Sequence, residues 1–442
     1  MTARALRIGG GAGFAGDRLP PAVDLVERGE LDYLVLECLA ERTIALGQQR
    51  RLADPELGYD QLLDKRMRLL LGPLVRTGTR LLGNFGAANP LGGARRVQRC
   101  AAELGVPVRV AAVLGDDVLT QIDPAAPAWE DGRPLAEHGE LVSANAYLGV
   151  DALLPALASD ADVIVCGRVA DPSLFLAPMA HHFGWRPDDH DRLASGTTVG
   201  HLLECGPQVT GGYFADPPYK HVPNLAGLGY PLAEVCADGT AVVTKLPGTG
   251  GRVDRMTVGE QLGYEVVDPT GYRTPDVVAD FTTVQFEEVG ADRVRIGPTV
   301  GRPRPDALKV SVGYRAGFRC EAEISYAGST AVARARLAGE VVAERLAGTG
   351  LRLAVSLIGV DALHGPGPGS AGRPYEVRLR VASVGASREL VEAVGEEVTA
   401  LYTSGPAGGA GVRVHTEVVI GVVSTSIPRA AVRTEVVPVG AP

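Results

Sequence analysis

Short apolar runs alternate with amphipathic segments through the first half of the chain. The apolar runs are continuous enough to form buried strands, and each ends in polar or glycine-rich residues. They cover residues 31–40, 80–89, 106–117 and 161–171. Between them, the spacing of apolar residues predicts helices over residues 20–29, 59–75, 92–105 and 144–160. This alternation predicts parallel βαβ units, and in such a sheet ligands bind beyond the carboxyl ends of the strands.

The pattern changes near Gly196, where glycine-rich and aromatic residues become frequent. Residues 307–328 alternate between apolar and polar, which predicts antiparallel strands, and residues 330–348 read as a helix. The stretch GPGPGSAGRP at 365–374 is typical of a linker or a long loop. Around it, strands and a helix are predicted over residues 351–361, 375–384, 387–405 and 412–427.

The predicted fold class is therefore α/β with two domains. Residues 1–345 would form a mostly parallel, Rossmann-like domain with an α+β extension. Residues 346–442 would form a small ferredoxin-like α+β domain.

Composition narrows the class of protein. With 442 residues, 45% hydrophobic and 21% charged, we expect an ordered globular protein, and a net charge of -9 argues against a nucleic-acid partner. No run approaches the roughly 18 to 20 apolar residues of a membrane span, and the first residues lack an apolar signal-peptide core, so a cytoplasmic location is expected. The six cysteines show no metal-ligand spacing, so no metal site is predicted.

Many segments together resemble one family, the AtuA-like proteins of acyclic terpene utilisation. The most distinctive are IGGGAGFAGDR, GNFGAANP, VCGRVADPSLFLAP, GTTVGHLLECGPQVTGGYFADP, KLPGTGGRV and EVTALYTSGPAGG. The resemblance covers essentially the whole chain and implies an α/β domain followed by a ferredoxin-like domain. It also implies a role in breaking down branched terpenoids as acyl-CoA thioesters, or in a natural-product pathway, since relatives occur beside both.

Near the start, Gly11, Gly13 and Gly16 have the GxGxxG spacing of a dinucleotide-binding turn. Glu37 lies about 20 residues further on, where such a motif places its ribose-binding acid. Against NAD or FAD, the prolines after Asp17 predict a late helix start, and an aspartate is unfavourable beside a pyrophosphate. A loop that holds another anionic or polar group, or a tight turn without a ligand, are the other interpretations.

Further candidates follow the predicted strands. Asn84 and Asn89 could bind a carbonyl or carboxylate, or could serve as turn and capping residues. Arg168, Asp171 and Ser173 could fix an anionic substrate, whereas an Arg–Asp pair that ties down the loop is the competing interpretation.

Two motifs in the second half of the chain also contain candidate catalytic or anion-binding residues. His201 and Glu204 would share one helix face as an acid–base pair, with Cys205 beside them as a possible nucleophile. Lys245, Thr249 and Gly250 belong to KLPGTGG, which could form an anion-binding nest or only a turn between strands.

The leading hypothesis is an enzyme that acts on an acyl thioester without a redox cofactor, CoA being part of the substrate. Hydration, lyase cleavage and acyl transfer to water or a sulfur acceptor all remain open. The alternatives are an NAD(P)-dependent oxidoreductase, and a non-catalytic subunit that binds a carboxylase-type partner. A homo-oligomer is expected, with no membrane partner.

Overall fold

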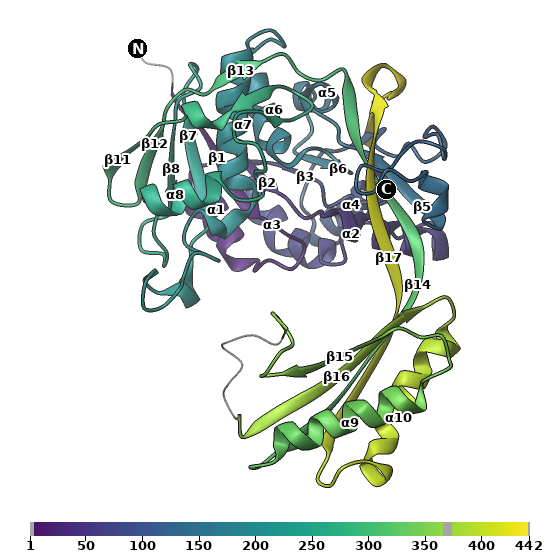
Figure 1. The fold of residues 1–442 in the computed structure, drawn as a ribbon. Helices are drawn as coiled ribbons and strands as arrows, with labels where there is room; N and C mark the ends of the chain where they lie inside the picture. Colours follow the sequence, from purple (N-terminus) through teal and green to yellow (C-terminus); the bar gives the residue numbers. More distant parts are fainter. Residues whose placement is uncertain (1–3, 366–373, 441–442) are drawn as a thin grey trace. The chain divides into compact units, whose positions relative to one another are not determined.

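The structure is a computed structural model, and it describes residues 4–365 and 374–440. The chain divides into two compact units (Figure 1). The first comprises Met1–Leu135, Leu141–Gly313 and Val422–Pro442, and the second comprises Ala136–Glu140 and Tyr314–Gly421. The predicted linker at 365–374 falls almost wholly outside the described residues.

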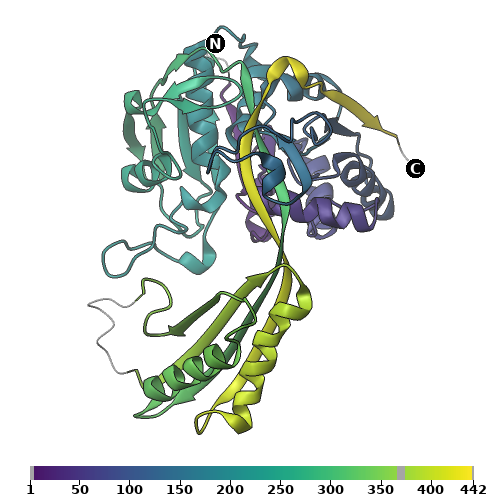
Figure 2. The same ribbon diagram turned by 45° about the vertical axis from the view of Figure 1, so that its right-hand side comes forward.

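A ten-stranded mixed sheet forms the centre of the first unit. In spatial order its strands are β11 (Phe286–Gly290), β12 (Arg293–Ile296), β8 (Ala241–Lys245), β7 (Pro231–Val235), β1 (Leu6–Ala12), β2 (Tyr33–Leu36), β3 (Arg80–Gly83), β6 (Val163–Cys166), β4 (Val110–Leu114) and β18 (Glu435–Val439). The strands from β1 to β4 pair in parallel. All others pair antiparallel, including β18, which ends near the C-terminus in Figure 2.

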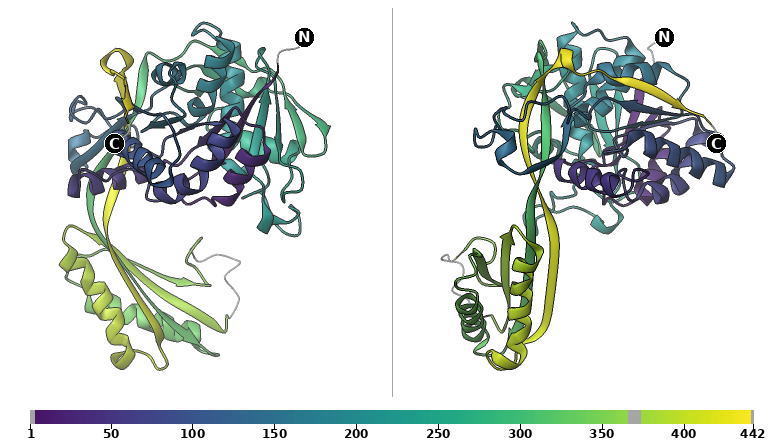
Figure 3. Two further views of the ribbon diagram at one scale, coloured as in Figure 1. Left: turned by 180° about the vertical axis from the view of Figure 1, so that it is seen from behind. Right: turned by 90° about the vertical axis from the view of Figure 1, so that its right-hand side faces the viewer.

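Helices cover both faces of this sheet (Figures 1 and 3). One face carries α1 (Pro20–Arg28), α3 (Leu63–Thr77) and α4 (Pro90–Leu104), whose apolar residues share a core with the parallel strands. The other carries α5 (Val150–Ala158), α6 (Asp171–Phe183) and α7 (His190–Glu204). Helices α2 (Glu41–Ala53) and α8 (Arg255–Leu262) lie on connections. The predicted α/β class is thus confirmed, but the expectation of a mostly parallel sheet is wrong, because antiparallel strands extend the parallel ones on both sides.

Helix α7 is buried almost all round and ends directly against β1. A Cβ atom on Gly10 would lie 2.8 Å from the carbonyl oxygen of Leu203, and one on Gly13 would lie 2.2 Å from the carbonyl carbon of Cys205. Real Cβ atoms do not approach backbone so closely. The glycines near the start of the chain therefore let the C-terminal end of α7 reach the carboxyl end of β1.

Smaller elements complete the first unit. Strands β9 (Tyr272–Arg273), β10 (Val278–Asp280) and β13 (Val300–Arg302) form a separate three-stranded sheet. Strand β5 (Glu140–Ala146) pairs with β14 (Ala307–Ala327). The helix predicted over residues 144–160 is therefore too long, because its first residues extend β5 and the helix begins only at Val150.

The second unit is a sheet with two helices on one face (Figures 1 and 3). Its strand order is β15 (Leu353–Ile358), β16 (Glu376–Gly385), β14 and β17 (Ala410–Pro428). Helices α9 (Ala331–Arg345) and α10 (Arg388–Ser404) share one apolar core with alternate residues of β14 and β16.

The boundary between the units differs from the predicted one at residues 345 and 346. The main segment of the second unit begins at Tyr314, inside the long strand β14, and the chain returns to the first unit at Val422, inside β17. A strand of 21 residues keeps its alternating pattern throughout, so nothing in its sequence marks the change of unit.

Candidate active site

Polar side chains gather where β2 and β3 end, as the position of ligand sites in parallel sheets predicts. Asn84 donates from Nδ2 to Oε1 of Glu37 at 2.8 Å and accepts from the Cys38 amide at 2.6 Å. The Leu39 amide also donates to Glu37 Oε1, at 2.8 Å. The Glu37 side chain is buried and fixed by these bonds, so it presents its carboxyl group in one orientation.

Burial raises the pKa of Glu37 to about 7. The nearby Glu204 carboxylate adds to this rise, whereas the Arg168 guanidinium and the hydrogen bonds from Asn84 and Leu39 oppose it. A carboxyl group that titrates near neutral pH can both take and give a proton at that pH. Glu37 therefore has the properties of a general acid or base.

The predicted acid–base pair forms at the end of α7. His201 Nδ1 and Glu204 Oε1 lie 2.9 Å apart, and the two residues are only 2% and 8% exposed. Burial raises the pKa of Glu204, although His201 opposes the rise. His201 Nε2 and Glu204 Oε2 are buried without a hydrogen-bond partner among the described residues. Because such groups destabilise a protein unless something satisfies them, they indicate that a water molecule or a ligand binds here.

Arg168 lies beside these groups, and we call Glu37, Asn84, Arg168, His201 and Glu204 the acid–base cluster. The Arg168 side chain donates to the carbonyl oxygens of Leu39 and Val169, at 2.6 to 3.0 Å, and pairs with Asp171. These contacts are those of an arginine that ties down two loops. They hold the segment after Glu37 in place.

Two tyrosines connect the cluster to a cavity of about 450 Å³. The Tyr272 ring stacks on Phe281 and lies 5.2 Å from the His201 ring, while Tyr147 lies under the Arg168 guanidinium at 4.7 Å. Tyr272 and Tyr147 both line this cavity, which we call the tyrosine cavity. Its other lining residues are Trp129, Ala170, Asp171, Pro172, Arg273, Thr274, Pro275, Pro305, Ala307, Leu308, Lys309 and Ser426.

Tyr147 and Lys309 are themselves held by Glu41. Tyr147 donates to Glu41 Oε1 at 2.6 Å, and Lys309 Nζ lies 3.3 Å from the same oxygen. Burial acts to raise the pKa of Glu41, but the Tyr147 hydrogen bond and the charges of Lys309 and Arg168 outweigh it and hold the pKa at about 2. Glu41 therefore stays ionised, in contrast to Glu37.

The sequence did not single out Tyr147, Tyr272, Lys309 or Glu41. Tyr147 lies in the segment read as one long helix, and Tyr272 lies on a strand of two residues. No periodic pattern marks either tyrosine, so only the tertiary fold identifies them.

Cys205 follows the acid–base pair directly, but its surroundings disfavour a thiolate. Burial raises the pKa of its thiol to about 12, and the Glu204 carboxylate adds to the rise. A nucleophilic cysteine needs the opposite shift.

Two other predicted residues near the strand ends have structural contacts. Asn89 caps α4 by accepting from the Gly92 amide at 3.0 Å, and it donates to the carbonyl oxygens of Pro55 and Leu57. Ser173 donates to Asp276 Oδ2 at 2.5 Å. In the described structure, neither side chain makes a hydrogen bond to the acid–base cluster.

Two amides of the glycine-rich opening are bonded within the loop itself. Gly11 lies within β1, and the amides of Gly13 and Phe14 donate to Asp17 Oδ2 at 2.6 and 3.3 Å. Helix α1 begins only at Pro20, four residues after Gly16. The carboxylate of Asp17 thus occupies the position where a dinucleotide fold binds pyrophosphate, which disfavours that use of the loop.

The KLPGTGG loop lies at the end of β8, outside the parallel strands. Lys245 Nζ lies 3.0 Å from Asp292 Oδ2 and donates to the Thr249 carbonyl oxygen, and Gly250 N donates to the Gly227 carbonyl oxygen at 2.8 Å. The Thr249 hydroxyl donates to the Leu246 carbonyl oxygen. These contacts are typical of a connecting turn, and they leave this motif apart from the cluster.

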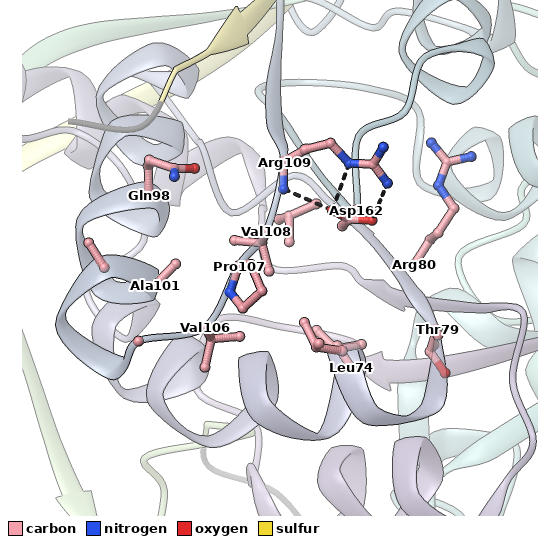
Figure 4. Close-up of a pocket in the computed structure, with 15 residues that line it drawn as sticks. Leu74, Thr79, Arg80, Gln98, Ala101, Val106, Pro107, Val108, Arg109 and Asp162 are labelled. Atoms are coloured by element: carbon pink, nitrogen blue, oxygen red, sulfur yellow. Dashed lines mark hydrogen bonds and ion pairs between the residues drawn. The ribbon is translucent and has the colours of Figure 1, made fainter.

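A cavity of about 860 Å³ lies at the opposite edge of the sheet, where β3, β4 and β6 begin (Figure 4). Arg109 is held there by Asp162, with donors 3.0 and 3.1 Å from the carboxylate, and Arg80 donates to carbonyl oxygens including those of Leu157 and Ala161. None of the residues predicted for the site lines this cavity. We therefore place the candidate site at the carboxyl ends of the parallel strands.

The pKa shifts predict how stability depends on pH. Burial raises the pKa of Glu37 to about 7 and those of Asp116 and Asp276 to about 6. In the unfolded chain these groups titrate near pH 4, so between about pH 5 and 8 the folded protein binds more protons. The free energy of unfolding should therefore fall as pH rises through this range, by about 3 kcal/mol for Glu37 alone.

Melting temperatures at pH 5.5, 6.5 and 7.5 test this pH dependence. Asp116→Asn is the matched variant, since an amide oxygen can still accept from the Arg168 amide and from Asn145. Between pH 5.5 and 7.5, the melting temperature of Asp116→Asn should fall less than that of the wild type. Stability that rises from pH 5.5 to 7.5 would contradict the expectation.

Metal and membrane features are not found in the part of the chain that the structure describes. Residues 4–365 and 374–440 contain no group of three or more His, Cys, Asp or Glu side chains arranged to hold a metal ion. Within the same residues, no helix combines the length and apolar character needed to cross a membrane.

Comparison with protein families identifies the family of this chain. The model described as acyclic terpene utilisation family protein AtuA matches residues 6–437, which is nearly the whole chain. No curated protein and no solved structure matched.

Proposed function

This chain belongs to the acyclic terpene utilisation family AtuA, and from that premise we propose that it is an enzyme acting on an acyl-CoA-type thioester. The reaction would use general acid–base groups and no redox cofactor. The pathway would be terpenoid breakdown or the biosynthesis of a natural product.

The observation that carries this proposal is the acid–base cluster itself. His201 Nε2 and Glu204 Oε2 lie buried and unpartnered in the described structure, close enough to Glu37 for the Glu204 charge to shift its pKa. Buried carboxyl groups whose pKa values are raised are typical of sites that transfer protons.

We propose addition of water to an α,β-unsaturated acyl thioester, or the reverse elimination, as the reaction. One carboxylate takes a proton from water while the water oxygen forms a bond to the β carbon. A second group gives a proton to the α carbon, so the carbon–carbon double bond is lost and the thioester bond stays intact. Glu37 and Glu204 provide the two carboxyl groups, and His201 orients Glu204.

Acyl transfer to water or to a sulfur acceptor is the other reaction open to a thioester. A route through an acyl-enzyme would need a protein nucleophile, and the raised pKa of Cys205 makes this thiol a poor one. Direct attack of water on the thioester carbonyl would need only a general base, with the CoA thiolate as the leaving group. The two reactions give different products, because acyl transfer breaks the thioester bond and hydration keeps it.

The tyrosine cavity suits a branched acyl group. Most of its lining is apolar, including Trp129, Pro172 and Leu308. Its charged lining residues are Arg273, Asp171 and Lys309, of which Lys309 is paired with Glu41. A cavity of about 450 Å³ falls within the usual size of small-molecule sites.

We also propose the finer fold assignments. The parallel strands with helices on both faces support a Rossmann-like core in the first unit. In the second unit, the chain order β14, α9, β15, β16, α10, β17 supports a ferredoxin-like fold.

Variants of the acid–base pair test the proposal. His201→Ala and Glu204→Gln should each lower turnover of a branched, unsaturated acyl-CoA at least about tenfold, because each removes a group that moves or positions a proton. Mass spectrometry of the products identifies the reaction, since hydration adds one water to the intact thioester and acyl transfer releases free CoA.

His182→Ala, which removes an exposed histidine at the end of α6, is the matched control and should retain wild-type turnover. Wild-type rates in both pair variants would remove His201 and Glu204 from the mechanism. Absence of turnover with every branched acyl-CoA tried would overturn the proposed substrate class.

A further inference from the structure

A second cavity, of about 580 Å³, also lies at the carboxyl edge of the parallel strands. It is enclosed by α2, by the loop after β1, by the residues after β2 and β3, and by the segment before α3. We call it the arginine cavity. Its lining residues are Ala15, Gly16, Cys38, Leu39, Thr43, Leu46, Gln49, Arg50, Ala53, Asp60, Gln61, Leu62 and Ala87.

Two arginines and two aspartates, Arg50, Arg66, Asp17 and Asp60, set the charge at this cavity. Arg66 is 1% exposed, donates from Nε to Asp60 Oδ2 at 2.9 Å and from Nη2 to the Ala15 carbonyl oxygen at 2.7 Å. Arg50 lines the cavity, and the Asp60 charge acts on it as well. The Asp17 carboxylate also acts on Arg66, so two carboxylates compensate the Arg66 charge and Arg50 carries the less compensated of the two charges.

Both guanidinium groups also have spare donors. Arg66 Nη1 and Arg50 Nε are buried and make no hydrogen bond within the described structure. Burial acts to lower the pKa of Arg50, which shows that its charge is poorly compensated there. A buried positive charge with unused N–H groups is stabilised by an anion that accepts from it.

We propose that the arginine cavity binds the anionic group, a phosphate or a carboxylate, of a small-molecule ligand. Arg50 would contact this group directly, and Arg66 would add its charge from behind Asp60. The apolar side chains of Leu39, Leu46 and Leu62 would contact the uncharged part of the ligand.

The cavity is coupled to the acid–base cluster through Leu39. The Leu39 amide donates to Glu37 and its carbonyl oxygen accepts from Arg168, while its side chain lines the cavity. A ligand in the arginine cavity would therefore contact the segment that fixes Glu37. The binding of an anion does not depend on the proposed reaction, but the identification of the anion as part of a CoA thioester rests on the proposed function.

Calorimetric titration of the full-length protein tests this proposal with three probes. CoA carries phosphates, pantetheine has the same thiol arm without them, and a branched ten-carbon carboxylic acid carries only a carboxylate. Arg50→Gln should weaken binding of CoA at least about tenfold and leave pantetheine unchanged, because a charge-assisted hydrogen bond is lost. If Arg50→Gln instead weakens binding of the carboxylic acid and leaves binding of CoA unchanged, the anion that the cavity binds is a carboxylate.

Arg51→Gln is the matched control. Arg51 is the next residue of α2 and loses the same charge, but it donates to the Ala88 carbonyl oxygen and does not line the cavity. The affinities of Arg51→Gln should stay within about twofold of those of the wild type. Arg50→Lys should bind the anion more tightly than Arg50→Gln does, because it keeps the positive charge. Melting temperatures show that the variants are folded.

Equal affinity of wild type and Arg50→Gln for both anions, or no binding of either anion to the wild type, would overturn the proposal. The outcomes for the two proposals are distinct. Turnover that depends on His201 with unchanged anion binding contradicts only the anion site, and anion binding that needs Arg50 without turnover contradicts only the proposed reaction.

Discussion

Replacing Glu37 with Gln is expected to lower turnover of an unsaturated acyl-CoA by about 100-fold. The amide oxygen of the variant can still accept from Asn84 and from the Leu39 amide, so the local hydrogen bonds are kept. What is lost is the proton-exchanging group, whose pKa burial raises to about 7. In the wild type, turnover should change with pH around this value, and in Glu37→Gln this part of the pH profile should disappear.

Glu41→Gln is the control for this experiment. Glu41 lies four residues from Glu37, but the Tyr147 hydrogen bond and nearby cations hold its pKa at about 2 despite its burial. Its replacement should therefore leave the pH dependence near neutrality in place. A Glu37→Gln enzyme with the wild-type pH profile would show that another group moves the proton.

The sequence alone did not indicate that Glu37 would exchange a proton near neutral pH. Its position about 20 residues after the glycine motif suggested a ribose-binding acid, whereas the structure places it against Asn84 and within the electrostatic reach of Glu204. Residues 37, 84 and 204 are distant in the chain. Their approach depends on the order of the parallel strands and on the course of α7, which local patterns do not encode.

Other features of the fold and of the candidate site could be predicted, because they depend on patterns within short stretches of sequence. Continuous apolar runs identified β2, β3, β4 and β6, and the polar residues after them included Asn84 and Arg168. The spacing of His201 and Glu204 predicted one helix face, and the two side chains do contact each other there. The same signals failed to separate Asn89 and Lys245 from the cluster, since a capping residue and a turn residue have the same sequence pattern as a binding residue.

Glycine patterns were the least specific signal. GxGxxG could mean a nucleotide, another anion or a tight turn, and the sequence alone could not distinguish them. In the structure, Asp17 takes up the loop amides and the glycines serve close packing of α7 on β1. The motif thus contributes to the candidate site by positioning the helix that carries His201 and Glu204.

Gly13→Ala is expected to destabilise the protein strongly. The added Cβ would lie 2.2 Å from the carbonyl carbon of Cys205 and 2.5 Å from its carbonyl oxygen, and neither backbone atom can rotate away. The end of α7 must move, which should destabilise the protein by about 3 kcal/mol or more and lower its melting temperature by about 5 °C or more. Because Glu204 lies directly before Cys205, turnover should fall as well.

Gly72→Ala in α3 provides the matched control for Gly13→Ala. The nearest atom to its new Cβ is the Arg76 Nη1 atom at 3.4 Å, at the end of a flexible side chain, and alanine favours a helix by up to about 1 kcal/mol over glycine. Its melting temperature should equal or exceed that of the wild type. If Gly13→Ala instead kept wild-type stability and turnover, the packing role of this glycine would be wrong. If it kept the fold but lost binding of NAD(P) that the wild type shows, the loop would serve a nucleotide and not the packing of α7.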